Sequence, residues 1–177
     1  MALIGLKNMY YAVLDSDTAE TATYQTPKKL ANAISVDITP NINEATLYGD
    51  DMPIATNSAI NKISVTIETS DIPLEDQAAL LGCVIQSDTL IARSTDIAPY
   101  VGLIFESETH EGKTRCVKLL KGKFAPSQET INTKGESLNY QVPKLTGSFV
   151  ARQRDNAWKM IKDYDKGAST ADWYTAI

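Results

Sequence analysis

Strict alternation of apolar and polar residues is the feature that most constrains how this chain folds. In residues 62–69, Ile63, Val65 and Ile67 alternate with polar side chains, and residues 33–39 repeat the pattern. A period of two places the apolar residues on one face of a strand and the polar residues on the other. The chain is therefore expected to contain an antiparallel sheet with one buried face and one solvated face.

Further strands are predicted by patterns of the same kind. They cover residues 5–14, 100–106, 114–124 and 138–152. His110 and its neighbours up to Lys113 separate two of these segments and predict a hairpin turn. Proline lacks the backbone N–H that a central strand needs, so Pro40 is expected to end the strand over 33–39. Pro143 confines its surroundings to an edge, a bulge or a strand end.

One helix is predicted over residues 73–81. A capping side chain precedes Pro73, Leu74 and Leu81 lie on one helical face, and Gly82 is a typical stop. A capping-box pattern over 169–172 predicts a second, short helix near the end of the chain. Strands still dominate, so the expected fold is mainly β (α+β): a β-sandwich or barrel with one flanking helix.

The stretch from residue 41 to 61 has no sustained periodicity, although it lies between two good strand patterns. It is expected to be a long inter-strand loop, and loops of this length usually carry function or are disordered. Disordered segments are uniformly polar, whereas this one contains Leu47, Tyr48, Met52 and Ile54. These four residues are therefore predicted to dock on another surface.

Composition bounds the class of protein. The chain has 177 residues and a net charge of −5, which fits one domain and disfavours a protein that grips nucleic acid through its phosphates. No apolar run approaches the ~18 residues that span a bilayer, and the start lacks a secretory signal pattern, so no membrane association is expected.

Cys83 and Cys116 are expected to be buried free thiols, although a disulfide stays possible.

No catalytic, cofactor-binding or metal-binding constellation is predicted. His110 is the only histidine, and Asp50 and Asp51 are the best candidate for a cation pair, but a solvated turn and an acidic loop tip explain them better. An enzyme that uses His110 or these carboxylates stays as a minor alternative. Basic residues gather between positions 113 and 123, where they favour either ion pairs with a partner surface or a solvated strand face. They are Lys113, Arg115, Lys118, Lys121 and Lys123.

Several short stretches, in consistent order from about residue 4 to 152, resemble one family. They are Ile4 to Ala12, Thr26 to Leu30, Thr46 to Asp51, Asp71 to Glu75, Ala98 to Leu103, Leu120 to Phe124, Lys134 to Glu136 and Gly147 to Val150. Together they resemble the major tail protein, or tail tube protein, of long-tailed non-contractile bacteriophages.

The resemblance implies a structural protein that is not an enzyme and needs no cofactor. Residues 1–152 would form a tail tube β domain, and residues 153–177 a C-terminal segment that packs on it or forms an arm. Hexameric rings of subunits would stack into a hollow tube that conducts DNA from capsid to host. The loop over 41–61 would reach the adjacent ring through Leu47, Tyr48, Met52 and Ile54. An acidic bore would let DNA slide without specific binding, and its candidate acids are Asp37, Glu44 and Glu68.

The implied partners are other copies of the chain, a tape measure protein, and tail terminator and tip proteins. The protein would belong to the tail of the virion and be assembled in the host cytoplasm. A related ring protein is the alternative: a tail terminator, a baseplate or tail-tip component, or the tube of a secretion or bacteriocin-like particle.

Overall fold

The computed structural model describes residues 2–30, 32–50, 52–128, 133, 142–175 and 177. These residues form a nine-stranded antiparallel sheet and a separate two-stranded hairpin. Along the sheet, strands follow the order β2-β1-β8-β9-β10-β5-β4, with β3 pairing with β1 and β11 pairing with β9. The strands are β1 (Leu3–Asp17), β2 (Ala22–Tyr24), β3 (Lys28–Lys29), β4 (Ala33–Gly49), β5 (Met52–Thr69), β6 (Val84–Gln86), β7 (Thr89–Ile91), β8 (Val101–Thr109), β9 (Thr114–Ala125), β10 (Lys144–Val150) and β11 (Lys159–Tyr164).

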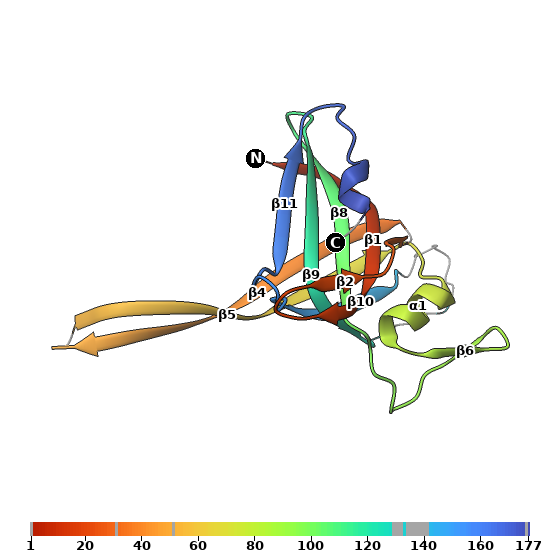
Figure 1. Ribbon diagram of the computed structural model, residues 1–177, viewed down its shortest axis with the longest axis horizontal. Helices are drawn as coiled ribbons and strands as arrows, with labels where there is room; N and C mark the ends of the chain where they lie inside the picture. Colours follow the sequence, from red (N-terminus) through yellow and green to blue (C-terminus); the bar gives the residue numbers. More distant parts are fainter. Residues whose placement is uncertain (1, 31, 51, 129–132, 134–141, 176) are drawn as a thin grey trace.

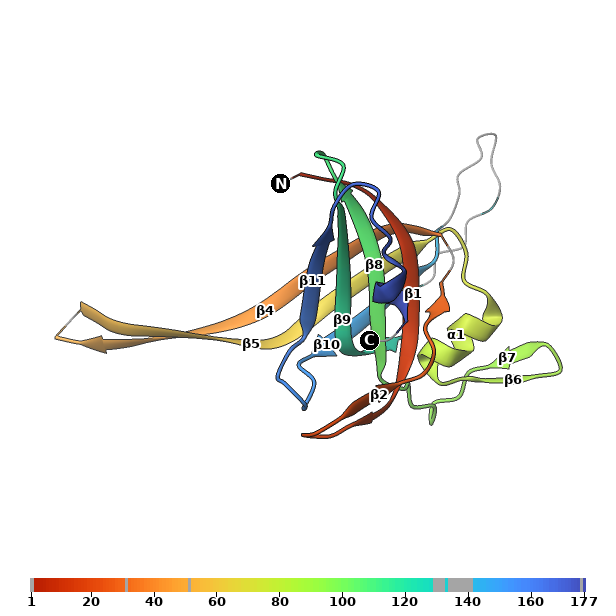
Figure 2. The ribbon, with the colours of Figure 1, turned by 45° about the horizontal axis from the view of Figure 1, so that its top comes forward.

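The sheet folds over on itself, and β9 belongs to both halves. Its first part, residues 114–119, pairs with β11, while residues 121–125 pair with β10. One layer therefore contains β1, β8, β9 and β11, and the other contains β10, β5 and β4, which cross behind the first in Figures 1 and 2. Between the layers lies the core, which includes Met9, Leu103, Phe105, Leu119, Ile63, Val65, Ile67, Phe124 and Phe149.

The helix α1 (Leu74–Leu81) closes one end of this core with Leu80 and Leu81. Gly82 ends it in the left-handed conformation, with φ of 74°, and a Cβ there would lie 2.3 Å from the carbonyl oxygen of Ile97. Only glycine fits this position, because both the space and the positive φ exclude a side chain. Pro73 itself is the N-cap residue and no side chain caps the helix, so the expected capping side chain is wrong.

The C-terminal segment covers the outer face of the first layer. After β11, a single 3-10 turn, η1 (Ala171–Tyr174), lies over β1 and β8 (Figure 2). The ring of Tyr174 lies 4.7 Å from that of Tyr10, and a Cβ on Gly102 would come within 2.6 Å of the Ile177 side chain. Both faces of this layer are therefore buried. The predicted capping box is wrong, because no side chain caps η1.

The expected mainly β fold with one flanking helix is confirmed. The predicted long loop over 41–61 is wrong: β4 and β5 continue through it as a paired hairpin. Pro40 does not end its strand either. It lies within β4, the last strand of the sheet. Along the outer edge of such a strand a backbone N–H has no neighbouring strand to bond, so proline is tolerated there.

The cysteine and strand predictions agree better with the structure. Cys83 and Cys116 are free thiols; Cys116 is fully buried and Cys83 partly so. Within the strand predicted over 138–152, residues 144–150 form β10, whereas 138–141 lie outside the described residues. Across the described part of the chain, no helix has the length and apolar character to cross a membrane.

Candidate assembly surfaces

The outer halves of β4 and β5 leave the body of the protein as a two-stranded hairpin, residues 42–60, which we call the arm (Figure 1). Its strands pair along their length, from Ile42 opposite Ile60 to Gly49 opposite Met52, with one register shift between Leu47 and Tyr48. The turn residue Asp50 has a positive φ of 50°, a conformation that aspartate tolerates better than most residues. The arm is therefore a regular element, joined to the body by continuous strands.

Local irregularities explain why the sequence pattern misses this hairpin. The register shifts between Asn41 and Ile42, and again between Leu47 and Tyr48. Each bulge adds a residue to one strand, which moves the following side chains to the opposite face and breaks the period of two. β-branched pairs such as Thr46 opposite Thr56 nevertheless favour strand pairing.

The tip of the arm exposes four large apolar side chains. Leu47 is 64% exposed, Tyr48 69%, Met52 68% and Ile54 68%. The structure thus brings together at one tip the four residues that the sequence predicted to dock. Clustered exposed apolar side chains of this kind commonly mark an interaction site.

A second surface is the solvated face of β4, β5 and β10. Cross-strand pairing places Ser35 beside Glu68, Asp37 beside Thr66, and Lys144 beside Glu68. The Glu68 carboxylate accepts a hydrogen bond from Ser35 at 2.9 Å and forms an ion pair with Lys144 at 2.6 Å. These two contacts lower the pKa of Glu68 below its usual value, and the contact with Lys144 has the larger effect.

The three candidate bore acids do not form one cluster. Asp37 and Glu68 share the solvated face of the body, while Glu44 lies on the arm opposite Ser58. The same face also carries Lys62 and Lys144, since both belong to its cross-strand pairs. The face is therefore mixed in charge. The period of two along β5 already places Lys62 on the face of Glu68, whereas the position of Lys144 depends on pairing of β10 with β5, which are distant along the chain.

The basic residues between 113 and 123 are mostly used within the subunit. Arg115 forms a two-bond ion pair with Asp163 of β11, each bond 2.7 Å long. Lys121 pairs at 2.6 Å with Asp17 of β1, and the Lys118 amino group lies 4.2 Å from the centre of the Trp173 ring. The expectation that Arg115 and Lys121 pair with a partner surface is wrong, because β1 and β11 supply their partners.

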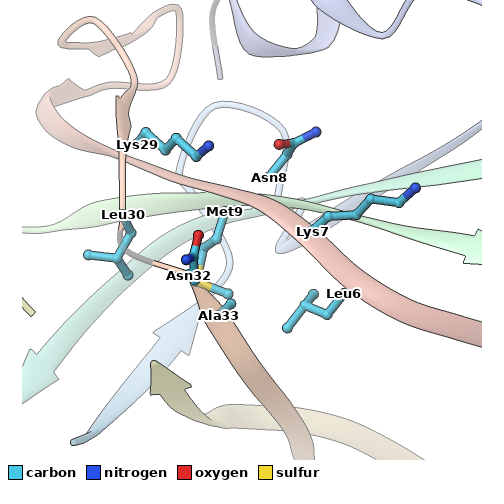
Figure 3. A pocket seen from close by; sticks show the side chains of 8 residues that line it. All are labelled: Leu6, Lys7, Asn8, Met9, Lys29, Leu30, Asn32 and Ala33. Carbon is cyan, nitrogen blue, oxygen red and sulfur yellow. The ribbon is translucent and has the colours of Figure 1, made fainter. Parts of the chain in front are cut away.

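A pocket lies where β1 passes the start of β4 (Figure 3). It encloses about 250 Å³ and combines apolar side chains with two amino groups and two amides. β1 is irregular here: its register against β8 shifts on both sides of Lys7, and Asn8 has a positive φ of 53°. The Asn8 amide is hydrogen-bonded to the buried Glu106 carboxylate, which supports this conformation. The lining residues are Leu6, Lys7, Asn8, Met9, Lys29, Leu30, Asn32 and Ala33.

The remaining candidates do not converge on a reaction centre. His110 lies in the β8–β9 turn, half exposed, with Glu111 at 4.0 Å. Asp50 is at the tip of the arm, and Asp51 lies outside the described residues. Among the residues the structure describes, no group of three or more histidine, cysteine, aspartate or glutamate side chains is arranged to hold a metal ion.

Comparison with known families identifies the chain's relatives. The sequence model of a family described as phage tail tube protein matches residues 1–175. A comparison with curated proteins gave no match.

Proposed function

Because this chain belongs to the phage tail tube protein family, and so is a structural component of the virion tail, we propose that it forms hexameric rings that stack into a hollow tube. DNA passes through this tube from capsid to host. The observation that carries the proposal is the arm: a long hairpin that leaves the body and ends in four exposed apolar side chains. A stacked assembly gives such an arm a surface in the adjacent ring.

Stacking follows from the energetics of the tip. Leu47, Tyr48, Met52 and Ile54 are all about two-thirds exposed in the subunit. Their burial on a neighbouring ring would contribute roughly 25 cal/mol for each Å² of apolar surface removed from water. The arm is already paired in the subunit, so docking does not have to overcome the entropy of ordering a free loop.

Ring closure is attributed to open strand edges. Among the described residues β4 pairs only with β5 and is the last strand of the sheet, so its other edge presents backbone groups that no described strand pairs. Within the described part of the chain, β11 likewise pairs with one strand, β9. Open edges favour pairing with another chain, and pairing between adjacent subunits would remove both from solvent.

The solvated face of β4, β5 and β10 is assigned to the bore. It is polar and lies open, while η1 and the segment around it cover the outer face of the other layer. Asp37 and Glu68 stand on this face among serine and threonine residues, and Lys144 neutralises Glu68. A weakly charged hydroxyl-rich wall would bind phosphates poorly and let DNA slide. Glu44 is assigned to the end of the bore reached by the arm.

The other proposed partners follow from this role. A tape measure protein would occupy the bore during assembly, and terminator and tip proteins would bind the two ends of the tube. Assembly takes place in the host cytoplasm and involves no membrane.

Negative-stain electron microscopy of the purified full chain at high concentration tests the proposal. Hollow tubes of uniform width and six-fold end views are the expected result. Single closed rings would instead favour a terminator or tip component, and a subunit that stays monomeric in the presence of tail-tip complexes would contradict the proposal.

A further inference from the structure

We infer that the pocket beside β1 is the receptor for the arm tip of another copy of this chain. The inference rests on the proposed stacking and names the surface that the arm contacts. Leu6 and Ala33 are the partly exposed apolar side chains of the pocket, and the core residues Met9 and Leu30 close it from beneath. Figure 3 shows Met9 and Ala33 lying close together beneath β1.

The arm of a subunit cannot reach the pocket of that same subunit. Ala33 at the pocket is the first residue of β4, and the tip lies beyond its last residue, Gly49. Seventeen residues of extended strand separate the two by about 50 Å, at ~3.3 Å per residue. Figures 1 and 2 show the arm running away from the body, with the start of β4 at its far side. A contact between tip and pocket therefore joins different subunits.

Charge distinguishes this pocket from the exposed apolar surface near α1. The arm carries Glu44 and, at its turn, Asp50, both exposed. At the pocket, Lys7 is paired with Glu108 at 3.0 Å, whereas exposed Lys29 makes no ion pair with any described residue. Such a cation beside partly exposed apolar side chains complements an apolar tip with an acidic turn.

The competing surface lies near α1 and the β6–β7 hairpin. Val84 and Ile97 are exposed there, Ile97 by 78%. The charged neighbours in this region include the carboxylates of Glu75, Asp88 and Asp96 and two cations, Arg93 and Lys28, the second of which lies 3.7 Å from Glu75. The carboxylates outnumber the cations. These carboxylates would repel the acidic turn of the arm, so this surface is the less favourable receptor.

A contact between tip and pocket also explains how a tube could grow without a fixed limit. The two complementary surfaces occupy opposite ends of one strand and differ from each other, so each subunit offers one tip and one pocket. A heterologous contact of this kind repeats from copy to copy and produces an open assembly when the rotation does not close it. Every added ring would present a new set of empty pockets.

Charge reversal and its rescue test the inference on the full chain. Lys29→Glu and Asp50→Lys should each lower the fraction of protein that pellets as tubes by about tenfold, since each places like charges in contact. A chain with both changes should recover most of the pelleted fraction. Lys166→Glu is the matched control, because Lys166 is an exposed lysine after β11 that lies beside Gly112 of the β8–β9 turn and does not line the pocket; it should leave the yield unchanged.

Tubes that pellet normally with both single reversals would overturn the docking site and leave the proposed function intact. A double variant that recovers none of the pelleted fraction would overturn the docking site as well. If Ile97→Ser abolishes tubes while Lys29→Glu does not, the receptor lies at the α1 end and the inference is wrong. Failure of the unsubstituted chain to form any assembly would instead contradict the proposed function.

Chemical cross-linking provides a readout that does not depend on tube yield. In a Cys83→Ser background, Thr46→Cys marks the arm and Asn32→Cys marks the pocket. With a short bis-maleimide linker, a mixture of the two singly marked chains should give dimers, and the doubly marked chain should give a ladder. Neither singly marked chain should dimerise alone. Dimers from Thr46→Cys alone would show that arms meet arms and would overturn the inference.

Discussion

The two halves of β5 both carry isoleucine side chains, but their surroundings differ. In the body, Ile63, Val65 and Ile67 are at most 1% exposed, whereas in the arm Ile60 is 49% and Ile54 68% exposed. Both halves pair with β4 in the same ladder. The difference is the second layer of the sheet, which covers one half of the strand and is absent from the other.

This contrast separates two sources of stability. Burial of apolar surface holds the body half, while the arm depends on backbone pairing and cross-strand contacts. An isolated two-stranded hairpin is marginal in water, and the continuous strands from the body keep this one in place. The arm half of β5 therefore has exposed apolar area that a partner could bury, whereas the apolar side chains of the body half are already buried.

The largest expected effect is a loss of stability when a buried side chain in the body half of β5 is truncated. Ile67→Ala should lower the free energy of unfolding by about 2–5 kcal/mol, because it leaves a cavity in the core. Ile54→Ala, the same kind of change on the arm, should alter it by less than about 0.5 kcal/mol. Denaturant unfolding of the monomer measures both. Equal losses from the two variants would show that the arm is packed within the subunit.

The next effect is a loss of polymerisation when the arm tip is changed and the body is left intact. Replacing Leu47 and Tyr48 together by serine should leave a folded monomer that no longer polymerises, since the docking surface is lost. Pelleting and electron microscopy measure the polymer, and circular dichroism checks the fold. The conservative pair Leu47→Met with Tyr48→Phe keeps the apolar area and should still form tubes. Normal tubes from the serine variant would eliminate the role assigned to the arm tip.

A smaller effect is expected on DNA passage. Replacing Asp37 and Glu68 by lysine should slow ejection severalfold, because cations on the bore attract phosphates, while tube length stays unchanged. Glu68→Lys also faces Lys144, so thermal unfolding of the variant has to be compared first. Asp37→Asn serves as the control and should have little effect on the ejection rate. Unchanged ejection by the lysine variant would remove this face from the bore.

Alternation of residue type was enough to predict the body half of β5 and the strand β10, because one face of each is buried and the other is not. The arm has no buried face, and two bulges shift its register, so the same signal disappears between 41 and 61. Pro40 wrongly predicted the end of a strand for a related reason. Proline is tolerated in an edge strand, and the sequence does not show which strand lies at the edge of the sheet.

The candidate surfaces divide in the same way. The four apolar tip residues stand out in the sequence because they interrupt a polar stretch. The pairing of Glu68 with Lys144, and the pocket formed between β1 and the start of β4, depend on contacts between distant segments. No local pattern carries that information, so neither feature was predicted.

The smallest expected effect is a pH-dependent change in stability, which compares a paired carboxylate of the body with one on the arm that forms no ion pair with a described residue. The Arg152 side chain is only 4% exposed and donates two hydrogen bonds, of 2.9 and 2.7 Å, to Asp155. These bonds lower the pKa of Asp155 to about 2. A lowered carboxyl pKa stabilises the fold above the ordinary value near 4, and this stability is lost as the pH falls from about 4 towards 2.

Asp155→Asn should therefore destabilise the subunit at pH 7, by no more than about 1 kcal/mol because the Asp155 side chain is 36% exposed. The difference from the unsubstituted chain should disappear near pH 2. Glu44→Gln on the arm is the control: Glu44 is exposed and makes no ion pair with a described residue, so the stability profile should not change. Thermal unfolding between pH 2 and 7 measures both. A profile that shifts equally for the two variants would show that arm and body carboxylates contribute alike, against the separation drawn from β5.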